Sequence, residues 1–308
     1  GYETKILTFR EIMKVPKRAD MLLKQFSSKY DDFISNRMFS KIKAYLPELI
    51  IVTYRHVNPM LIGRLKKELP SRPIVIQINV DQLSTLRNQQ VLASDYDYYF
   101  TKDPYMVQFM RSKAGLNAFY LPEAHNKNIH VKPNINKKEL EEKIDIDVLV
   151  FGNIYPYRAR IVQHLISKGI KVKLFGKRGT YFPNYLNSYF QNLFITGDKK
   201  SEFLYGAKIV FNNFHYAEIE SANCKYFEIN GIGAFQICDY KPTLKEYSSV
   251  DPERYTYKNI EEAVAKTNYF LKNPKERYAI AEEHYQFAIK HNTYQKRIEK
   301  IFSTIGFQ

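Results

Sequence analysis

Short apolar runs alternate with amphipathic stretches along almost the whole chain. Residues 48–54 (ELIIVTY) and 72–80 (RPIVIQINV) are apolar and rich in β-branched residues, a pattern typical of buried strands. Between them, residues 58–69 have helical spacing, with Asn58 placed as the N-cap and Pro59 at the first helical position. Because strands and helices alternate in this way, we predict an α/β fold with a parallel sheet and right-handed crossovers.

Further segments continue this pattern through the first part of the chain. They are a strand at 5–9, a basic helical region at 17–45, a strand at 96–101, a helix at 102–115 that stops at Gly115, and a strand at 117–124. The region 17–45 is one broken helix or two. Its apolar residues face either the protein core or an anionic bilayer surface.

A polar segment at 126–145, rich in Asn, Lys and Glu, is typical of a linker, and the alternation restarts after it. The second series has strands at 147–153, 170–179, 207–214 and 233–240, a helix at 157–169, and helices through most of 260–302. A chain of 308 residues is long enough for two domains. We therefore predict two similar α/β domains followed by a helical tail.

The formal net charge of +15 calls for an anionic partner, which could be nucleic acid, an acidic membrane or a phosphorylated ligand. The basic residues are dispersed and no known nucleic-acid-binding module is recognisable, so a nucleic-acid-binding protein is a less favoured alternative. The two cysteines, Cys224 and Cys238, form no CxxC pair or Cys/His cluster, which argues against a zinc site. Free cysteines and the absence of a signal-peptide core predict a cytoplasmic location.

Glycines mark three predicted strand exits in the second half of the chain. Gly152 and Asn153 precede a helix that carries Arg158, Lys177 lies between two glycines, and Gly197 precedes another helix. Glycine lets the backbone approach a ligand, while helix N-termini and arginine suit phosphate. These exits predict a phosphate-bearing ligand, and the lack of GxGxxG and GxxxxGK[ST] motifs argues against a dinucleotide dehydrogenase or a P-loop NTPase.

Two glutamates, Glu220 and Glu228, lie eight positions apart in the stretch ESANCKYFEINGIGAF. If the stretch is helical, Lys225 and Glu228 share one face. A carboxylate there can accept two hydrogen bonds from a vicinal diol such as a ribose, and the ammonium group can reach a phosphate. Gly233 then allows the chain to turn into the following strand.

Taken together, several segments resemble nucleotide-sugar glycosyltransferases with the two-domain GT-B fold, most closely the spore-maturation, CgeB-type branch. The segments include VLVFGNIYPYRARIV, KVKLFG, YGAKIVFNNF, KYFEINGIGAFQICD and the C-terminal run YFLKNPKERYAIAEEHYQFAIKHNTYQKRIEKIF. The resemblance implies two Rossmann-like domains that face each other across a cleft. Residues 1–140 would form the acceptor-side domain and 141–285 the nucleotide-sugar domain, and 286–308 would form a helix that packs back toward the first domain.

Site residues follow from the same resemblance. It implies that Glu228 binds the ribose diol and that Glu220 is a catalytic residue on the donor sugar. The remaining donor-sugar residues would be Ser221, Ala222 and Asn223, and the diphosphate would lie near Gly152, Asn153, Arg158, Lys177 and Lys225. Two features depart from the family pattern: Lys225 replaces a common arginine, and FHYAEIE replaces the usual glycine-rich turn before Glu220.

Three polar residues at predicted strand exits are candidates on the acceptor side: His56, Asp81 and His125. Any of them could deprotonate an acceptor hydroxyl or simply position it. We predict His125 as the catalytic residue because its strand exit best resembles that of the family.

The resemblance implies transfer of a hexosyl or related sugar to a glycan, lipid-linked or protein acceptor, within bacterial surface glycan or glycoconjugate synthesis. The nucleotide diphosphate-sugar is the co-substrate, no other cofactor or metal is expected, and the two-carboxylate element favours retention of configuration. The basic N-terminal region predicts peripheral contact with the anionic inner membrane face. The alternative is a non-catalytic two-domain sugar-nucleotide-binding or scaffold protein.

Overall fold

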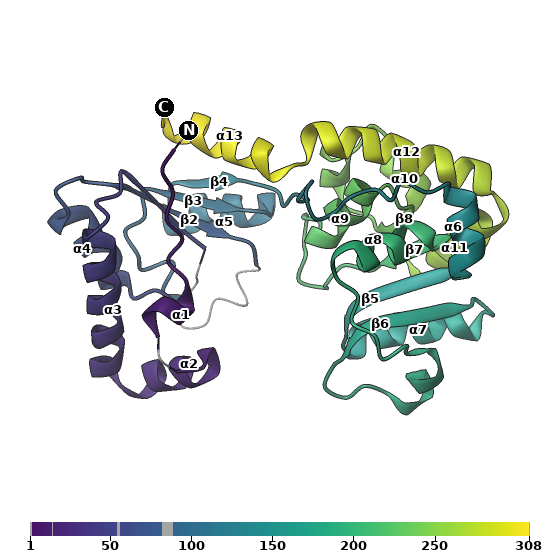
Figure 1. The fold of residues 1–308 in the computed structure, drawn as a ribbon, viewed down its shortest axis with the longest axis horizontal. Helices are drawn as coiled ribbons and strands as arrows, with labels where there is room; N and C mark the ends of the chain where they lie inside the picture. The colour runs from purple at the N-terminus through teal and green to yellow at the C-terminus, as the bar shows by residue number, and fades with distance from the viewer. Residues whose placement is uncertain (1, 14, 54–55, 82–88, 308) are drawn as a thin grey trace. The chain divides into compact units, whose positions relative to one another are not determined.

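The computed structural model describes residues 2–13, 15–53, 56–81 and 89–307. The chain forms two compact units, Gly1–Leu121 and Pro122–Gln308 (Figure 1). Each unit has its own parallel β-sheet and its own helices, in agreement with the predicted α/β class. The first unit ends at Leu121, earlier in the chain than the predicted domain boundary at residue 140.

In the first unit, four parallel strands follow one another in chain order. They are β1 (Leu49–Val52), β2 (Ile74–Asn79), β3 (Tyr98–Thr101) and β4 (Ala118–Tyr120). Helix α4 (Pro59–Glu68) connects β1 to β2, and α5 (Pro104–Ala114) connects β3 to β4. As predicted, Asn58 caps α4 by accepting the Met60 N–H at 2.9 Å, and Gly115 ends α5 in the left-handed conformation.

The N-terminal region corrects one prediction and decides between two alternatives. Residues 2–8 form no regular element and pair with none of the described strands, so the predicted strand at 5–9 is wrong. The chain instead enters a short helix, α1 (Phe9–Ile12). The region 17–45 forms two helices, α2 (Lys17–Phe26) and α3 (Ser28–Lys43), which separate where Ser27 caps α3.

The second sheet contains five parallel strands in the order β6-β5-β7-β8-β9. They are β5 (Val148–Ile154), β6 (Val172–Arg178), β7 (Ile209–Asn212), β8 (Gln236–Asp239) and β9 (Thr256–Tyr257). From β5, the chain moves to one side to form β6 and then crosses to the other side to form β7. The chain therefore reverses its direction along the sheet at β5.

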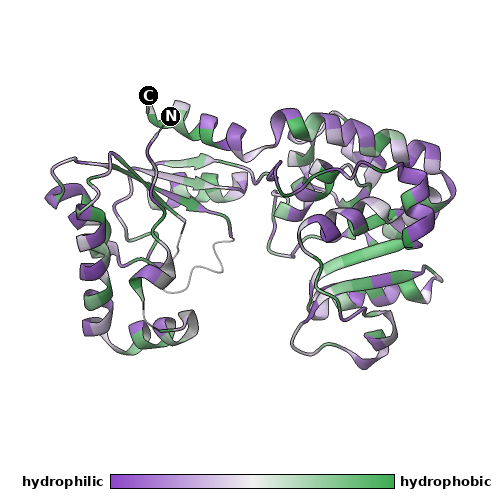
Figure 2. Cartoon of the chain, in the orientation of Figure 1, coloured by the Kyte–Doolittle hydropathy of each residue, from purple (hydrophilic) through white to green (hydrophobic). Residues whose placement is uncertain are grey.

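Eight α-helices belong to the described residues of the second unit. They are α6 (Lys137–Ile144), α7 (Pro156–Ser167), α8 (Gly197–Gly206), α9 (Cys224–Ile232), α10 (Pro252–Tyr255), α11 (Ile260–Lys272), α12 (Pro274–His291) and α13 (Tyr294–Ile305). Strand β5 is buried along residues 148–151 and hydrophobic over most of its length (Figure 2), as expected for a parallel strand that is covered on both faces.

The C-terminal residues differ from the predicted single helix at 286–308. Helix α12 begins before residue 286 and continues to His291, and a separate helix, α13, begins at Tyr294. Thr293 caps α13 by accepting the Lys296 N–H at 3.3 Å. The predicted packing of this end against the first domain stays a prediction.

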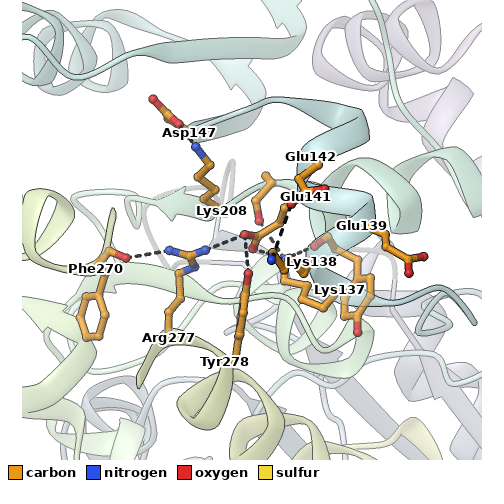
Figure 3. A network of polar contacts seen from close by, with 12 residues as sticks. Lys137, Lys138, Glu139, Glu141, Glu142, Asp147, Lys208, Phe270, Arg277 and Tyr278 are labelled. Atoms are coloured by element: carbon orange, nitrogen blue, oxygen red, sulfur yellow. Dashed lines mark hydrogen bonds and ion pairs between the residues drawn. The ribbon is translucent and has the colours of Figure 1, made fainter. Parts of the chain in front are cut away.

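The predicted linker at 126–145 contains a helix, α6, which belongs to the second unit. Asn136 caps it, and Leu140 is fully buried in the core of that unit. Glu141 accepts a hydrogen bond from the Arg277 guanidinium at 2.6 Å and another from the Tyr278 hydroxyl at 2.8 Å (Figure 3). The polar composition of this segment therefore reflects a buried ion pair that holds α6 to α12.

Candidate functional site

The reversal of chain direction at β5 marks a location for a site. In open parallel sheets, ligands bind outside the carboxyl ends of the strands where the strand order reverses. Here those ends belong to β5 and its neighbour β7, and they carry Gly152, Asn153, Asn212 and Asn213. The predicted phosphate-binding exit at Gly152 and Asn153 therefore lies at the switch point of the sheet.

Arg158, in the first turn of α7, connects the ends of β5 and β7. Its Nε donates to Asn213 Oδ1 at 2.7 Å, one Nη donates to the Asn153 carbonyl at 2.8 Å, and the other donates to the Asn213 carbonyl at 3.3 Å. The side chain is buried, and burial lowers its pKa, but a guanidinium keeps its charge at neutral pH. Among the described residues its hydrogen-bond acceptors are neutral oxygens, so no described carboxylate bonded to it cancels its positive charge.

Lys225 brings a second cation to the same place. It is the second residue of α9, and its Nζ donates to the Phe151 carbonyl at 3.1 Å. Burial and the nearby Arg158 charge hold the pKa of Lys225 well below its usual range. An anion bound beside it would offset both effects and favour the charged ammonium form.

Gly152 leaves room between these two cations. A Cβ atom at this position would lie 3.3 Å from Arg158 Nη1 and 3.5 Å from Lys225 Nζ. Its φ of 103° also favours glycine over other residues. The backbone of the β5 exit therefore approaches both cations closely, as the predicted diphosphate site requires.

Glu228 lies farther along α9 and has two partners that the sequence did not identify. Lys200 Nζ, from α8, lies 2.6 Å from Glu228 Oε2, and His130 Nε2 lies 3.4 Å from Glu228 Oε1. The Asn126 N–H donates to His130 Nδ1 at 3.1 Å, so a neutral His130 carries its proton on Nε2 and directs it at Glu228. Burial lowers the pKa of His130, which keeps the ring neutral at pH 7.

Sequence signals for these two partners differ. Lys200 lies three residues after Gly197, which marks one of the three predicted strand exits. His130 lies in a polar stretch without periodicity, and no pattern in the sequence distinguishes it.

The loop that carries Glu220 is held from the end of β8. Lys241 Nζ donates to the Ile219 carbonyl at 2.9 Å and also to the Glu218 carbonyl. Thr243 Oγ1 donates to the carbonyl of Glu220 itself. These bonds hold three successive carbonyls, and they show how the chain fixes the loop without a glycine-rich turn.

The other predicted donor-sugar residues are engaged within the protein. Ser221 and Ala222 are buried, and the Ser221 hydroxyl donates to Glu218 Oε2 at 2.5 Å. Asn223 caps α9 by accepting the Tyr226 N–H at 3.1 Å. Among the predicted donor-sugar side chains, Glu220 is the one that is partly exposed and makes no cap, and the sugar contacts of all four stay predictions.

Lys177 shares the carboxyl edge of the sheet with these residues. It lies next to the last residue of β6 and is the register partner of Asn153. The side chain is exposed, and its Nζ lies 5.3 Å from the Phe194 ring centroid. It is thus one strand away from the exit of β5, where Arg158 and Lys225 meet Gly152.

His125 is placed differently from the prediction. It belongs to the second unit, and its ring packs so closely on Gly231 of α9 that a Cβ there would lie 2.5 Å from His125 Cδ2. The ring is fully buried, which lowers its pKa to about 4. An enclosed neutral imidazole acts here as a packing residue, and its catalytic role stays a prediction.

The remaining acceptor-side candidates, His56 and Asp81, are partly buried residues that follow β1 and β2 in the first unit. His56 Nδ1 lies 3.4 Å from Gln90 Nε2, and the Asp81 N–H donates to Asn79 Oδ1 at 3.2 Å. Within the described residues, no cluster of three His, Cys, Asp or Glu side chains could hold a metal ion, and no helix is long and apolar enough to span a membrane.

Comparison with known proteins agrees with the architecture. Residues 158–303 match a protein family described as "Glycosyl transferase-like". No curated protein matches the sequence.

Solved structures with similar folds include the following three proteins. Sucrose-phosphate synthase from Thermosynechococcus elongatus has a TM-score of 0.67 at 10% identity, over 94% of this chain and 79% of its own. Anabaena HepE, solved with UDP-glucose, has a TM-score of 0.68 at 10% identity, over 96% and 90% of the two chains. TarM has a TM-score of 0.63 at 10% identity, over 88% and 58%. The chain therefore has the α/β fold with two parallel sheets that GT-B glycosyltransferases share, and most of its second unit matches a glycosyl transferase-like family.

Proposed function

We propose that this protein is a glycosyltransferase that moves a sugar from a nucleotide diphosphate donor to a hydroxyl acceptor. The observation that carries the proposal is the pair of basic side chains at the switch point, Arg158 and Lys225. Both approach Gly152, and neither is bonded to a carboxylate in the part of the chain that the structure describes. A diphosphate supplies the missing negative charge. Glu228, on the same helix as Lys225, offers the carboxylate that a ribose diol requires.

The same residues suit the chemical step. When the bond from the sugar to the diphosphate breaks, negative charge develops on the leaving group. Arg158 and Lys225 are held in place before the reaction by hydrogen bonds to backbone carbonyls, so they can stabilise that charge with little rearrangement. Because these side chains supply positive charge at the leaving group, we propose transfer that does not depend on a metal ion.

Glu228 has to change partners when the donor binds. In the free protein its carboxylate is neutralised by Lys200 at 2.6 Å. A ribose diol that donates two hydrogen bonds to Glu228 releases Lys200 for the nearby diphosphate, which places a third cation close to the phosphates. Glu220, in the loop fixed by Lys241 and Thr243, is proposed as the residue on the donor sugar, with retention of configuration.

A UDP-sugar is the first donor to test, since the HepE structure of similar fold was solved with UDP-glucose. A hexosyl group is consistent with that neighbour and with TarM, solved with UDP and α-GlcNAc-glycerol. A role in bacterial surface glycan synthesis stays a prediction.

Thermal stabilisation tests the proposal directly. We expect at least one of UDP, GDP, ADP, CDP and TDP to raise the melting temperature, and the matching nucleotide-sugar to be hydrolysed slowly without acceptor. Glu228→Gln should remove the stabilisation. A protein that binds a nucleoside diphosphate but never cleaves its sugar donor would instead be the non-catalytic binding protein, and a protein that no nucleotide stabilises would contradict both.

We further propose peripheral contact of the first unit with anionic membranes. Helix α2 exposes three large apolar side chains, Leu22, Leu23 and Phe26, on a chain with a net charge of +15. Flotation with vesicles that contain phosphatidylglycerol, compared with pure phosphatidylcholine, tests this contact. Phe26→Glu should abolish it, and equal recovery of the variant and the wild type would contradict it.

A further inference from the structure

A closed ring of hydrogen bonds joins the first turn of α9 to β7 and β8. The Tyr226 N–H donates to Asn223 Oδ1 at 3.1 Å, and Asn212 Nδ2 donates to the same oxygen at 3.2 Å. Asn212 Nδ2 also donates to Gln236 Oε1 at 3.0 Å. Gln236 Nε2 then donates to the Tyr226 carbonyl at 2.9 Å, which closes the ring at the residue where it began.

Backbone groups determine the direction of every bond in this ring. The Tyr226 N–H can only donate, so Asn223 must present its oxygen to it. The Tyr226 carbonyl can only accept, so Gln236 must present its NH₂ group there and its oxygen to Asn212. Asn212 is therefore a donor to two acceptors at once, and its own oxygen accepts the Asn223 Nδ2–H at 3.1 Å.

Burial makes this ring hard to rearrange. Asn212, Tyr226 and Gln236 are almost fully buried, so water is not available to replace a lost partner. The ring also extends inward, because Gln236 Nε2 donates to Asn230 Oδ1 at 2.7 Å and His284 Nδ1 lies 3.1 Å from the same oxygen. An Asn230 oxygen that already accepts from Gln236 requires His284 to carry its proton on Nδ1.

The ring lies beside the residues of the proposed site. Lys225 is the neighbour of Tyr226, and its Nζ reaches the Phe151 carbonyl from the first turn of α9. Glu228 follows on the same helix and meets Lys200. A rotation or shift of this first turn would displace Lys225 from Gly152 and Arg158, and it would displace Glu228 from the ribose position.

We propose that Asn212 is a positioning residue for the nucleotide-sugar site, and that it acts through Asn223 and Tyr226 to set the placement of Lys225 and Glu228. This inference rests on the proposed function. Asn212 itself is buried at the end of β7 and needs no contact with the donor. Asn212 differs from the other residues of the ring because its NH₂ group donates to two side-chain oxygens, those of Asn223 and Gln236.

Asn212→Asp tests the inference with almost no change in volume. The carboxylate places an acceptor against Asn223 Oδ1 and Gln236 Oε1, so the ring has to open. We expect calorimetry to show at least tenfold weaker binding of UDP, or of whichever nucleoside diphosphate stabilises the wild type, and a donor KM raised by a similar factor with the acceptor KM unchanged. Asn212→Ala, which removes both donations without repulsion, decides the question in the same way if the aspartate variant does not fold.

Two controls separate positioning from general loss of stability. Asn136→Asp makes the same change at the cap of α6, where an acceptor is all that is needed, and should bind the nucleotide as the wild type does. Ala263 is buried in α11, and Ala263→Gly should lower the melting temperature by destabilising this helix. The affinity for the nucleotide should be unchanged. A folded Asn212→Asp protein with wild-type affinity overturns the positioning role alone, whereas a wild type that binds no nucleoside diphosphate overturns the proposed function together with it.

Discussion

Two carboxylate–cation pairs in the second unit have the same contact distance and different surroundings. Glu141 meets Arg277 at 2.6 Å, and Glu228 meets Lys200 at 2.6 Å. The Glu141 and Arg277 side chains are only 6% and 2% exposed, whereas those of Glu228 and Lys200 are 15% and 16% exposed. The first pair joins α6 to α12 inside the unit, and the second lies near the carboxyl edge of the sheet.

The partners of each carboxylate explain what each pair can do. Around Glu141, Lys137 Nζ lies 2.9 Å from one oxygen, while Arg277 and Tyr278 bond the other (Figure 3). Glu228 has one lysine and a neutral histidine, and a ligand can replace either. A buried ion pair with all its partners inside the protein supports the fold, and a partly exposed pair beside Arg158 and Lys225 can exchange partners with a ligand.

The largest expected effect is on stability and comes from breaking the enclosed pair. Arg277→Met leaves Glu141 buried with only Lys137 to compensate it, so we expect the free energy of unfolding to fall by about 3–5 kcal/mol. Urea denaturation measures this change. The double variant Glu141→Leu/Arg277→Met should recover most of the loss, because replacing a whole buried pair with apolar residues costs little. A single variant as stable as the wild type would contradict the structural role.

Lys225→Met should have the next largest effect, and on activity. Loss of one preorganised charge at the leaving group lowers kcat by roughly 10²–10³-fold in comparable electrostatic sites. Turnover of the nucleotide-sugar donor, with donor hydrolysis as a second assay, measures the change. The melting temperature should not fall, since methionine fills the same space without the cost of charging a lysine beside Arg158. Lys225→Arg is the matched control, and we expect it to keep most of the activity.

Glu228→Gln should weaken donor binding without lowering stability. The amide keeps the shape of the side chain but loses the negative charge that strengthens the two hydrogen bonds donated by the diol. Hydrogen bonds to a charged group contribute about 1.5–3 kcal/mol, so we expect affinity to fall by roughly 10–100-fold. Titration calorimetry with the nucleoside diphosphate measures it. Glu141→Gln, the matched change in the enclosed pair, should do the reverse: a less stable protein with unchanged affinity. If both variants behave alike, the distinction between the two pairs is wrong.

Much of the fold and part of the candidate site could be predicted from the sequence. Periodicity and capping residues predicted strands β1 to β8 and helices such as α4 and α5, because those signals act within one turn or one strand. The sequence indicated that Gly152, Arg158 and Lys225 share a phosphate site, but it did not indicate how closely the two basic side chains approach Gly152. Their contact with Asn213 and Phe151 depends on strand order, which no local pattern contains.

Other features depend on partners distant in the chain and left no local signal. Helix α6 looked like a linker because Glu141 and Lys137 are polar, and their partner Arg277 lies 136 positions away from Glu141. His130 in the same stretch meets Glu228 only through the tertiary fold. The apolar run at 5–9 read as a strand because alternation does not show whether a neighbouring strand is present.

Lys137 gives a pH-dependent test of the enclosed cluster. Burial lowers the pKa of Lys137 to about 8 in the folded protein, compared with about 10.4 in the unfolded chain. Between these values the unfolded state binds more protons, so this residue makes stability increase with pH, by at most about 1.4 kcal/mol per pH unit. The measurement is the difference in unfolding free energy between the wild type and Lys137→Met from pH 7.5 to 10. A difference that stays constant over this range would contradict the assigned pKa.

Lys177→Ala should have the smallest effect, because this cation is exposed where Lys225 is enclosed. Lys177 is the register partner of Asn153 at the same edge of the sheet, but solvent screens its charge. We expect donor affinity to fall no more than about fivefold, or roughly 1 kcal/mol, and the loss to disappear as salt is raised from 50 mM to 500 mM. The Lys225→Met defect should persist at high salt. A Lys177→Ala defect as large and as resistant to salt as that of Lys225→Met would move the diphosphate from Gly152 toward the end of β6.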